Sequence, residues 1–218
     1  MKPKFKITIV GLAVLVFGAC AAKSNRARDP REIRVYQGER LSSINDFREN
    51  SIRGPQKVDT ATYRLEVRGL VDTPLVYRYG DVLKNFTSYR KVVTLHCVEG
   101  WDVKLLWEGV RLRDLFARAG VKPEATVVIF YSVDGYSTSL PLDYIIDKNI
   151  MLGCKMNGVT LPPERGFPFE LVAEDKWGYK WAKWISAVEL SADVGFRGFW
   201  DARGYNQNGD ASGPMDEG

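Results

Sequence analysis

Histidine is nearly absent from this sequence: its 218 residues contain one, His96. A single histidine excludes zinc sites built from several histidines and haem held by two histidines. His96 and Cys97 are neighbours in a stretch with a strand pattern, and neighbouring strand residues point to opposite faces, which argues against a Cys–His hydrolase pair. No Cys-x-x-Cys-His motif occurs, so the sequence has no attachment site for a c-type haem.

The chain also has little long apolar sequence. Its N-terminal apolar stretch, residues 7–17, is too short to span a bilayer comfortably and follows three lysines, as in a signal peptide. Phe-Gly-Ala-Cys at residues 17–20 looks like a bacterial lipobox, whose cysteine is lipidated. We therefore expect residues 1–19 to be a lipoprotein signal peptide and Cys20 to carry the lipid. The alternative is plain secretion, with cleavage near residue 19 or 22.

Excess charge is small once this segment is set aside. The whole chain has 31 basic and 27 acidic residues. Residues 1–19 hold three lysines and no acid, so 28 basic residues remain against 27 acidic ones. This balance gives no support to a nucleic-acid partner.

The rest of the chain mixes short strand and helix patterns. Residues 63–70 alternate apolar and charged side chains, as a half-exposed strand does. Residues 111–119 form an amphipathic helix pattern closed by Gly120. Asn157-Gly158 predicts a hairpin turn. Composition and pattern favour a compact domain with more strand than helix.

Residues 92–101 carry the strongest functional signal. An apolar, β-branched run predicts a buried strand and places Cys97 at its end, before Gly100. A thiol there can face a cleft; the alternative is a small buried hydrophobic residue. Cys-Val-Glu-Gly-Trp at residues 97–101 resembles the metal-binding strand end of the sulfite oxidase-like molybdopterin enzymes. The resemblance implies that the Cys97 thiolate is the one protein ligand to the molybdenum of a Mo-molybdopterin cofactor.

Two further segments resemble the same family. Residues 45–49 are similar to an early loop of the form Asn-x-Phe-Tyr-Glu, with arginine in place of tyrosine. Residues 166–184 resemble a C-terminal segment in which a lysine and turn amides bind the pterin phosphate. Nucleic-acid stacking by its lysines and aromatics lacks support from charge, and a solvated strand edge is the remaining alternative. The resemblance implies that these residues hold the pterin: Asn45, Arg48, Glu49, Ser132, Arg165, Trp181, Ala182 and Lys183.

Some residues depart from the family pattern or have weaker support. Glu170 stands where the family has arginine, and a carboxylate facing a phosphate would be repelled. Either Arg165 supplies the lost charge, which we predict, or Glu170 turns away and pairs with a lysine. Tyr136, in an Asp-Gly-Tyr turn, is a catalytic candidate in the substrate pocket; its alternative is a surface aromatic. A disulfide between Cys97 and Cys154 is permitted outside the cytoplasm, but it would consume the metal ligand.

Together these features predict an α+β protein with β-rich mixed sheets, short helices and the sulfite oxidase-type molybdopterin-binding fold. We expect a tether at residues 20–42, the oxidoreductase domain at 43–205 and a disordered tail at 206–218. In size the chain resembles the catalytic subunit of periplasmic methionine-sulfoxide reductases.

The resemblance implies a molybdenum-dependent oxidoreductase, lipid-anchored on the periplasmic face of a bacterial membrane. It would move an oxygen atom to or from a small substrate, such as a sulfoxide or an oxyanion. Without a haem motif, it would exchange electrons with a separate electron-transfer protein. The alternative is a non-catalytic lipoprotein that keeps the fold as a binding module, which Glu170 in place of arginine favours.

Overall fold

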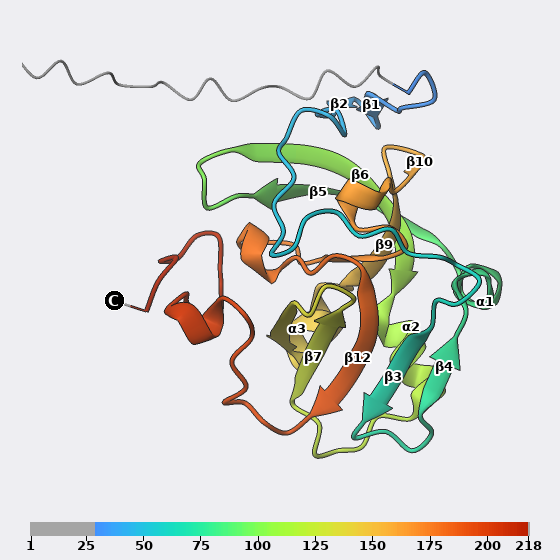
Figure 1. Cartoon of the computed structure of the whole chain (residues 1–218), viewed down its shortest axis with the longest axis vertical. Coiled ribbons are helices and arrows are strands. Elements are labelled where there is room, and N and C mark those ends of the chain that lie inside the picture. The colour runs from blue at the N-terminus through green and yellow to red at the C-terminus, as the bar shows by residue number, and fades with distance from the viewer. Residues whose placement is uncertain (1–28, 218) are drawn as a thin grey trace, which may run out of the picture.

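Two five-stranded β-sheets form the framework of the computed structural model, which describes residues 29–217 (Figure 1). The predicted signal peptide and Cys20 lie outside these residues. One sheet has the order β10 (Val159–Thr160), β9 (Met151–Met156), β6 (Asp102–Arg111), β5 (Tyr89–His96), and β11 (Glu170–Val172) also pairs with β9. The other has the order β4 (Leu75–Tyr77), β3 (Leu65–Gly69), β12 (Ile185–Ser191), β7 (Val127–Ser132), β8 (Ser137–Pro141).

Helices are short and few in the described part of the chain. They are α1 (Tyr79–Asn85), α2 (Leu112–Ala119) and α3 (Leu142–Asp147), with 3-10 turns η1 (Pro163–Arg165), η2 (Gly178–Lys180) and η3 (Asp201–Arg203). Strands β12 and β3 pair in parallel, whereas the other pairings are antiparallel. Mixed sheets with short helices confirm the predicted α+β class.

Local sequence signals are confirmed where turn chemistry decides the conformation. Asn157 and Gly158 both have positive φ, 50° and 80°, as a type I′ hairpin turn between β9 and β10 requires. Helix α2 buries Leu112, Leu115 and Phe116 and ends at Gly120, whose φ of 70° is left-handed.

One apolar core joins the two sheets. Leu65 of β3, Trp107 of β6 and Phe130 of β7 are fully buried in the same cluster. Strand β12, which the sequence pattern did not predict, lies between β3 and β7 and completes the sheet that also contains β4 and β8. The core therefore depends on pairings between residues more than a hundred positions apart in the chain.

The domain begins earlier than the predicted boundary at residue 43. A short hairpin of β1 (Val35–Tyr36) and β2 (Glu39–Arg40) precedes it. The side chain of Glu32 is 2% exposed and accepts hydrogen bonds from Ile44 N and Asn157 Nδ2. The tether prediction is therefore wrong for residues 29–42, because a buried carboxylate fixes this segment to the hairpin turn.

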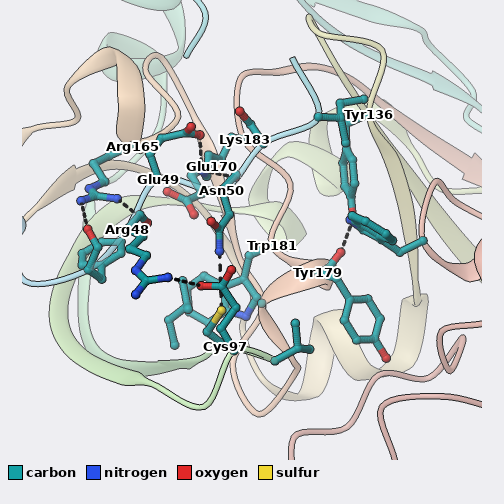
Figure 2. A pocket seen from close by; sticks show the side chains of 18 of the residues that line it. Arg48, Glu49, Asn50, Cys97, Tyr136, Arg165, Glu170, Tyr179, Trp181 and Lys183 are labelled. Carbon is teal, nitrogen blue, oxygen red and sulfur yellow. Dashed lines mark hydrogen bonds and ion pairs between the residues drawn. The ribbon is translucent and has the colours of Figure 1, made fainter. Parts of the chain in front are cut away.

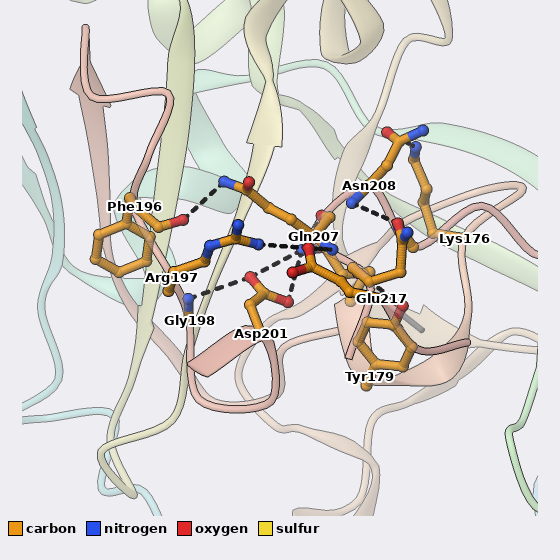
Figure 3. Close-up of polar contacts among 12 residues, drawn as sticks. Lys176, Tyr179, Phe196, Arg197, Gly198, Asp201, Gln207, Asn208 and Glu217 are labelled. Carbon is orange, nitrogen blue, oxygen red and sulfur yellow. Dashed lines mark hydrogen bonds and ion pairs between the residues drawn. The ribbon is translucent and has the colours of Figure 1, made fainter. Parts of the chain in front are cut away.

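The predicted disordered tail is wrong for residues 206–217. Trp177 N donates to Gly209 O at 2.7 Å, and the buried ammonium of Lys180 donates to Gln207 O at 2.7 Å. Near the end of the chain, Arg197 pairs with Glu217 at 2.6 Å (Figure 3). Polar and glycine-rich composition suggested disorder, but tertiary hydrogen bonds hold the segment on the domain.

Among the helices of residues 29–217, none has the length and apolar character needed to cross a bilayer.

Candidate active site

A cavity of about 470 Å³ opens where the end of β5 meets four segments distant in sequence (Figure 2). Its walls come from the loop at residues 47–52, the turn at 97–101, the turn at 134–136, the segment from η1 to Trp184, and the C-terminal residues Trp200 and Tyr205. Aromatic side chains make up much of the surface, namely Phe47, Trp101, Tyr136, Tyr179, Trp181, Trp184, Trp200 and Tyr205.

Cys97 lines this cavity directly after the last residue of β5. Its carbonyl accepts from Gly100 N, and its own N–H donates to Trp101 O, both at 3.0 Å. Gly100 has a φ of 82°, which glycine adopts without strain. This tight turn carries the chain out of the sheet and leaves the sulfur at the cavity wall.

The sulfur of Cys97 has a hydrogen-bond donor but little solvent. Cys97 is 6% exposed, and Asn50 Nδ2 lies 3.7 Å from its Sγ. Burial raises the pKa of the thiol, whereas a backbone hydrogen bond at Glu99 and the Asn50 amide oppose that rise. Asn50 was not predicted from the sequence, although it directly follows the loop motif that ends at Glu49. Cys97 and Cys154 are both free thiols.

Glu99 connects the cysteine turn to the loop at residues 47–52. Its carboxylate accepts from Trp101 Nε1 at 3.0 Å and lies 4.0 Å from Arg48 Nη1. The Trp101 hydrogen bond is the main cause that lowers the pKa of Glu99. The exposed Arg48 thus lies at the cavity with its charge partly balanced.

Lys183 joins the C-terminal segment to the same loop. Its ammonium donates to Glu49 Oε1 at 3.0 Å and to the carbonyl of Asn50 at 2.6 Å. The next residue, Trp184, has a φ of 52° and donates its indole N–H to Pro163 O at 2.7 Å. The structure therefore brings the two predicted cofactor segments together, although 134 positions separate Glu49 from Lys183.

Arg165 holds the backbone of the loop at residues 44–48. Its guanidinium donates to the backbone carbonyls of Ile44, Phe47 and Arg48 at 3.0, 2.6 and 3.0 Å. It also stacks 3.6 Å from the centre of the Phe47 ring. The side chain is a cavity residue and a clamp on the loop, so its predicted role as a cofactor-facing cation stays a prediction.

Glu170, on β11, also lines the cavity, and its burial has an electrostatic consequence. It is 2% exposed, and its Oε2 has no hydrogen-bond partner in the described chain. Burial raises its pKa to about 8, although the charges of Lys183 and Arg165 lower it. Burial therefore favours the uncharged form of this carboxyl group.

The predicted site residues fall into two groups. Those that line the cavity are Arg48, Glu49, Cys97, Tyr136, Arg165, Trp181 and Lys183. Asn45, Ser132 and Ala182 do not line it. Ala182 is fully buried and its carbonyl accepts from Leu171 N, while the buried Ser132 Oγ has no hydrogen-bond partner in the described chain. The cofactor contacts of these three residues stay predictions.

The C-terminal aromatics were missed by the sequence analysis. Tyr136 donates its hydroxyl to the carbonyl of Tyr179, which holds two cavity walls together. The ring of Tyr205 lies 5.0 Å from those of both Tyr179 and Trp200. The sequence shows these residues in an aromatic stretch at 198–205, but it does not show their place at the cavity.

The sequence model of the family described as oxidoreductase molybdopterin binding domain matches residues 52–200. The chain is 38% identical over 157 residues to an uncharacterized oxidoreductase, YuiH, of Bacillus subtilis, covering 72% of this chain and 78% of YuiH. It is 33% identical over 151 residues to a putative protein-methionine-sulfoxide reductase subunit, YedZ1, of Azospira oryzae, covering 69% and 57% of the two chains.

Among solved structures, the sulfane dehydrogenase SoxCD of Paracoccus pantotrophus is similar, with a TM-score of 0.60 and 27% identity. The match covers 64% of this chain and 40% of the SoxCD chain. This chain therefore spans only part of YedZ1 and of SoxCD.

Proposed function

The chain belongs to the family of oxidoreductase molybdopterin-binding domains, and from this premise we propose that it transfers an oxygen atom to or from a small substrate outside the cytoplasm. Family membership confirms the predicted enzyme class and its Mo-molybdopterin cofactor. The substrate, the electron partner and the location are proposals.

The residues of the cavity fit such a cofactor. A buried thiol with a hydrogen-bond donor on its sulfur suits a soft metal ligand. Lys183, Arg165 and Arg48 line the same space and supply cationic donors for an anionic cofactor, with the carboxylates of Glu49 and Glu99 beside them. Glu170 also lines the cavity, and its buried Oε2 has no hydrogen-bond partner among residues 29–217, which is unusual for a polar atom.

The residues of the cavity would then have specific roles in binding the cofactor. Cys97 would hold the metal as a thiolate, and a coordinating thiol is deprotonated whatever its free pKa. Asn50 would orient the sulfur and reduce its negative charge. Lys183, Arg48, Glu49, Arg165 and Trp181 would hold the pterin. When bound, the cofactor supplies the redox-active metal and two further sulfur ligands.

Aromatic walls would keep water away from the reacting atoms. Trp101, Trp181 and Tyr136 line the cavity. The indole N–H groups of the two tryptophans and the hydroxyl of Tyr136 already donate hydrogen bonds to other residues of the chain. A water-poor site strengthens every electrostatic contact made in it and limits side reactions.

An electron partner and an extracytoplasmic location complete the proposal. The sequence has no haem attachment motif, and YedZ1 is named as a subunit, which supports exchange of electrons with a separate protein. The signal-peptide pattern of residues 1–19 supports export, with Cys20 as the lipid anchor.

Cys97 at the wall of a cofactor-sized cavity is the observation that carries the proposal. The test is to express the protein with molybdenum in a host that makes the pterin. Metal content and the electron paramagnetic resonance of the Mo(V) state are then measured, with turnover of small sulfoxides and oxyanions. Purified protein without molybdenum would overturn the proposal and favour the non-catalytic binding module. The feature of the sequence that favours this alternative is Glu170 in place of the family arginine.

A further inference from the structure

Glu170 lies at the cavity end that also holds Arg165, Glu49 and Lys183 (Figure 2). We propose that Glu170 is an uncharged carboxylic acid in the folded protein and donates its proton in a hydrogen bond to an oxygen at the anionic end of the bound cofactor. The inference rests on the proposed function, and it assigns Glu170 as a binding residue.

Neither a side chain on the neighbouring strand nor bulk water offers the Glu170 carboxyl group a hydrogen bond. Its partner across the sheet on β9 is Gly153, which has no side chain to offer. Its exposed fraction is 2%, so bulk water does not solvate it. Its Oε2 has no hydrogen-bond partner among residues 29–217. A buried polar oxygen without a partner is rare in native proteins, and the residue that carries it lines the cavity.

The charged groups around Glu170 are Lys183, Arg165 and Glu49. The ammonium of Lys183 donates to Glu49 Oε1 and to the Asn50 carbonyl, and the Arg165 guanidinium donates to three loop carbonyls. Their charges favour ionisation of Glu170, but Glu49 disfavours it and burial outweighs them, so the pKa rises to about 8. Geometry and electrostatics agree on a neutral acid.

A neutral acid also resolves the conflict between Glu170 and an anionic ligand. Lys183 and Arg165 would attract the anionic end of the cofactor to this part of the cavity. A carboxylate would repel that group, whereas a protonated carboxyl donates a hydrogen bond to it. Glutamine has the same shape, stays uncharged and keeps an N–H donor, so Glu170→Gln is the matched control and Glu170→Ala removes the donor.

The first measurement needs no cofactor. Infrared spectra of the apo protein at pH 7 should contain the carbonyl stretch of a protonated carboxyl group, and Glu170→Gln should remove it. If the wild type and Glu170→Gln have identical spectra in this region at pH 7, Glu170 is ionised and the proposal is wrong.

The second measurement is retention of the cofactor. Molybdenum and pterin are quantified per protein chain after gel filtration at neutral and at alkaline pH. Binding that requires the proton weakens by up to about tenfold per pH unit above the pKa, so the wild type should lose cofactor at alkaline pH. Glu170→Gln should retain it at both pH values, and Glu170→Ala should retain less than either at neutral pH.

The outcomes separate this inference from the proposed function. A loaded wild type whose retention matches both variants at both pH values overturns the hydrogen bond alone. A wild type that takes up no molybdenum overturns the proposed function and the hydrogen bond together.

Discussion

At the scale of single residues, Cys97 differs from Cys154 in what surrounds its sulfur. Cys97 lies at a cavity wall with an amide donor 3.7 Å away, whereas Cys154 is 2% exposed and its thiol is 3.5 Å from the Glu108 carbonyl. Only the first can reach a ligand. The same substitution at each of the two cysteines therefore tests whether Cys97 is the metal ligand.

We predict that Cys97→Ser abolishes oxygen-atom transfer and that Cys154→Ser keeps most of it. A serine alkoxide is a harder and more basic ligand than a thiolate and should bind the metal poorly. The measurements are turnover and the Mo(V) paramagnetic signal at equal molybdenum content. An unchanged Mo(V) signal in Cys97→Ser would remove Cys97 as the ligand.

Glu170 should make stability depend on pH. Its pKa is about 8 when folded but near 4.5 when the chain is unfolded, so folding takes up a proton between these values. Stability therefore falls as pH rises through this window, by at most about 1.4 kcal/mol per pH unit, and levels off above pH 8. Urea denaturation of the apo protein should show the advantage of Glu170→Gln growing from about pH 5 to pH 8. A constant difference would contradict the neutral acid.

Arg165 should stabilise the loop as well as any ligand. Arg165→Ala removes the donors of three loop carbonyls and the stacking on Phe47, which should lower the free energy of unfolding by about 2–4 kcal/mol. Arg203 is the control, because it stacks 3.6 Å from the Phe199 ring but donates to one carbonyl at an exposed site. Arg203→Ala should lower the free energy of unfolding by less than half as much. Equal losses in the two variants would show that the carbonyls need no donor.

At the scale of elements, the C-terminal segment of residues 198–217 is held by a buried ion pair. Lys180 of η2 and Asp201 of η3 have side chains that are 0% and 2% exposed, and their charged atoms lie 3.2 Å apart. Asp201 also accepts from Gly198 N, and Lys180 donates to Gln207 O. This pair fixes the segment that brings Trp200 and Tyr205 to the cavity.

We predict that Lys180→Met destabilises the protein by about 3–5 kcal/mol, because it leaves the Asp201 charge buried without its partner. The matched control is Lys148→Met, which breaks an exposed pair with Asp175 and should leave stability nearly unchanged. Chemical denaturation gives the free energies, and limited proteolysis should show earlier cleavage near the C-terminus in Lys180→Met only. Equal cleavage in the two variants would show that the Lys180–Asp201 ion pair does not hold the C-terminal segment in place.

The elements nearest the site follow local rules that the sequence displays. Strand β5 ends at His96, as its apolar run predicts, and Gly100 turns the chain. The pairing of β12 between β3 and β7 obeys no local rule, because its neighbours in the sheet are distant in sequence. The first kind of feature is predictable from short-range sterics, and the second is not.

At the scale of the whole molecule, we propose that residues before the described domain decide the location of the protein. We predict that Cys20→Ala moves the protein out of the membrane fraction, since lipid chains bind a bilayer by about 0.8 kcal/mol per buried CH₂ group. Cell fractionation and the intact mass of the mature protein measure this. Cys154→Ser is the control and should stay with the membrane. A Cys20→Ala protein still found in the membrane would contradict the lipid anchor.

The sequence by itself determined a domain with more strand than helix, because strand periodicity and turn chemistry are local properties. The resemblance of its motifs to a known family predicted the family and the candidates Cys97, Glu49, Arg165 and Lys183. Only the tertiary structure decided that Asn50 reaches the Cys97 sulfur and that residues 206–217 pack on the domain. It alone also desolvates Glu170 and directs the Arg165 guanidinium to three carbonyls. These features depend on burial and on contacts between segments up to 134 positions apart, and neither quantity is encoded at any one place in the chain.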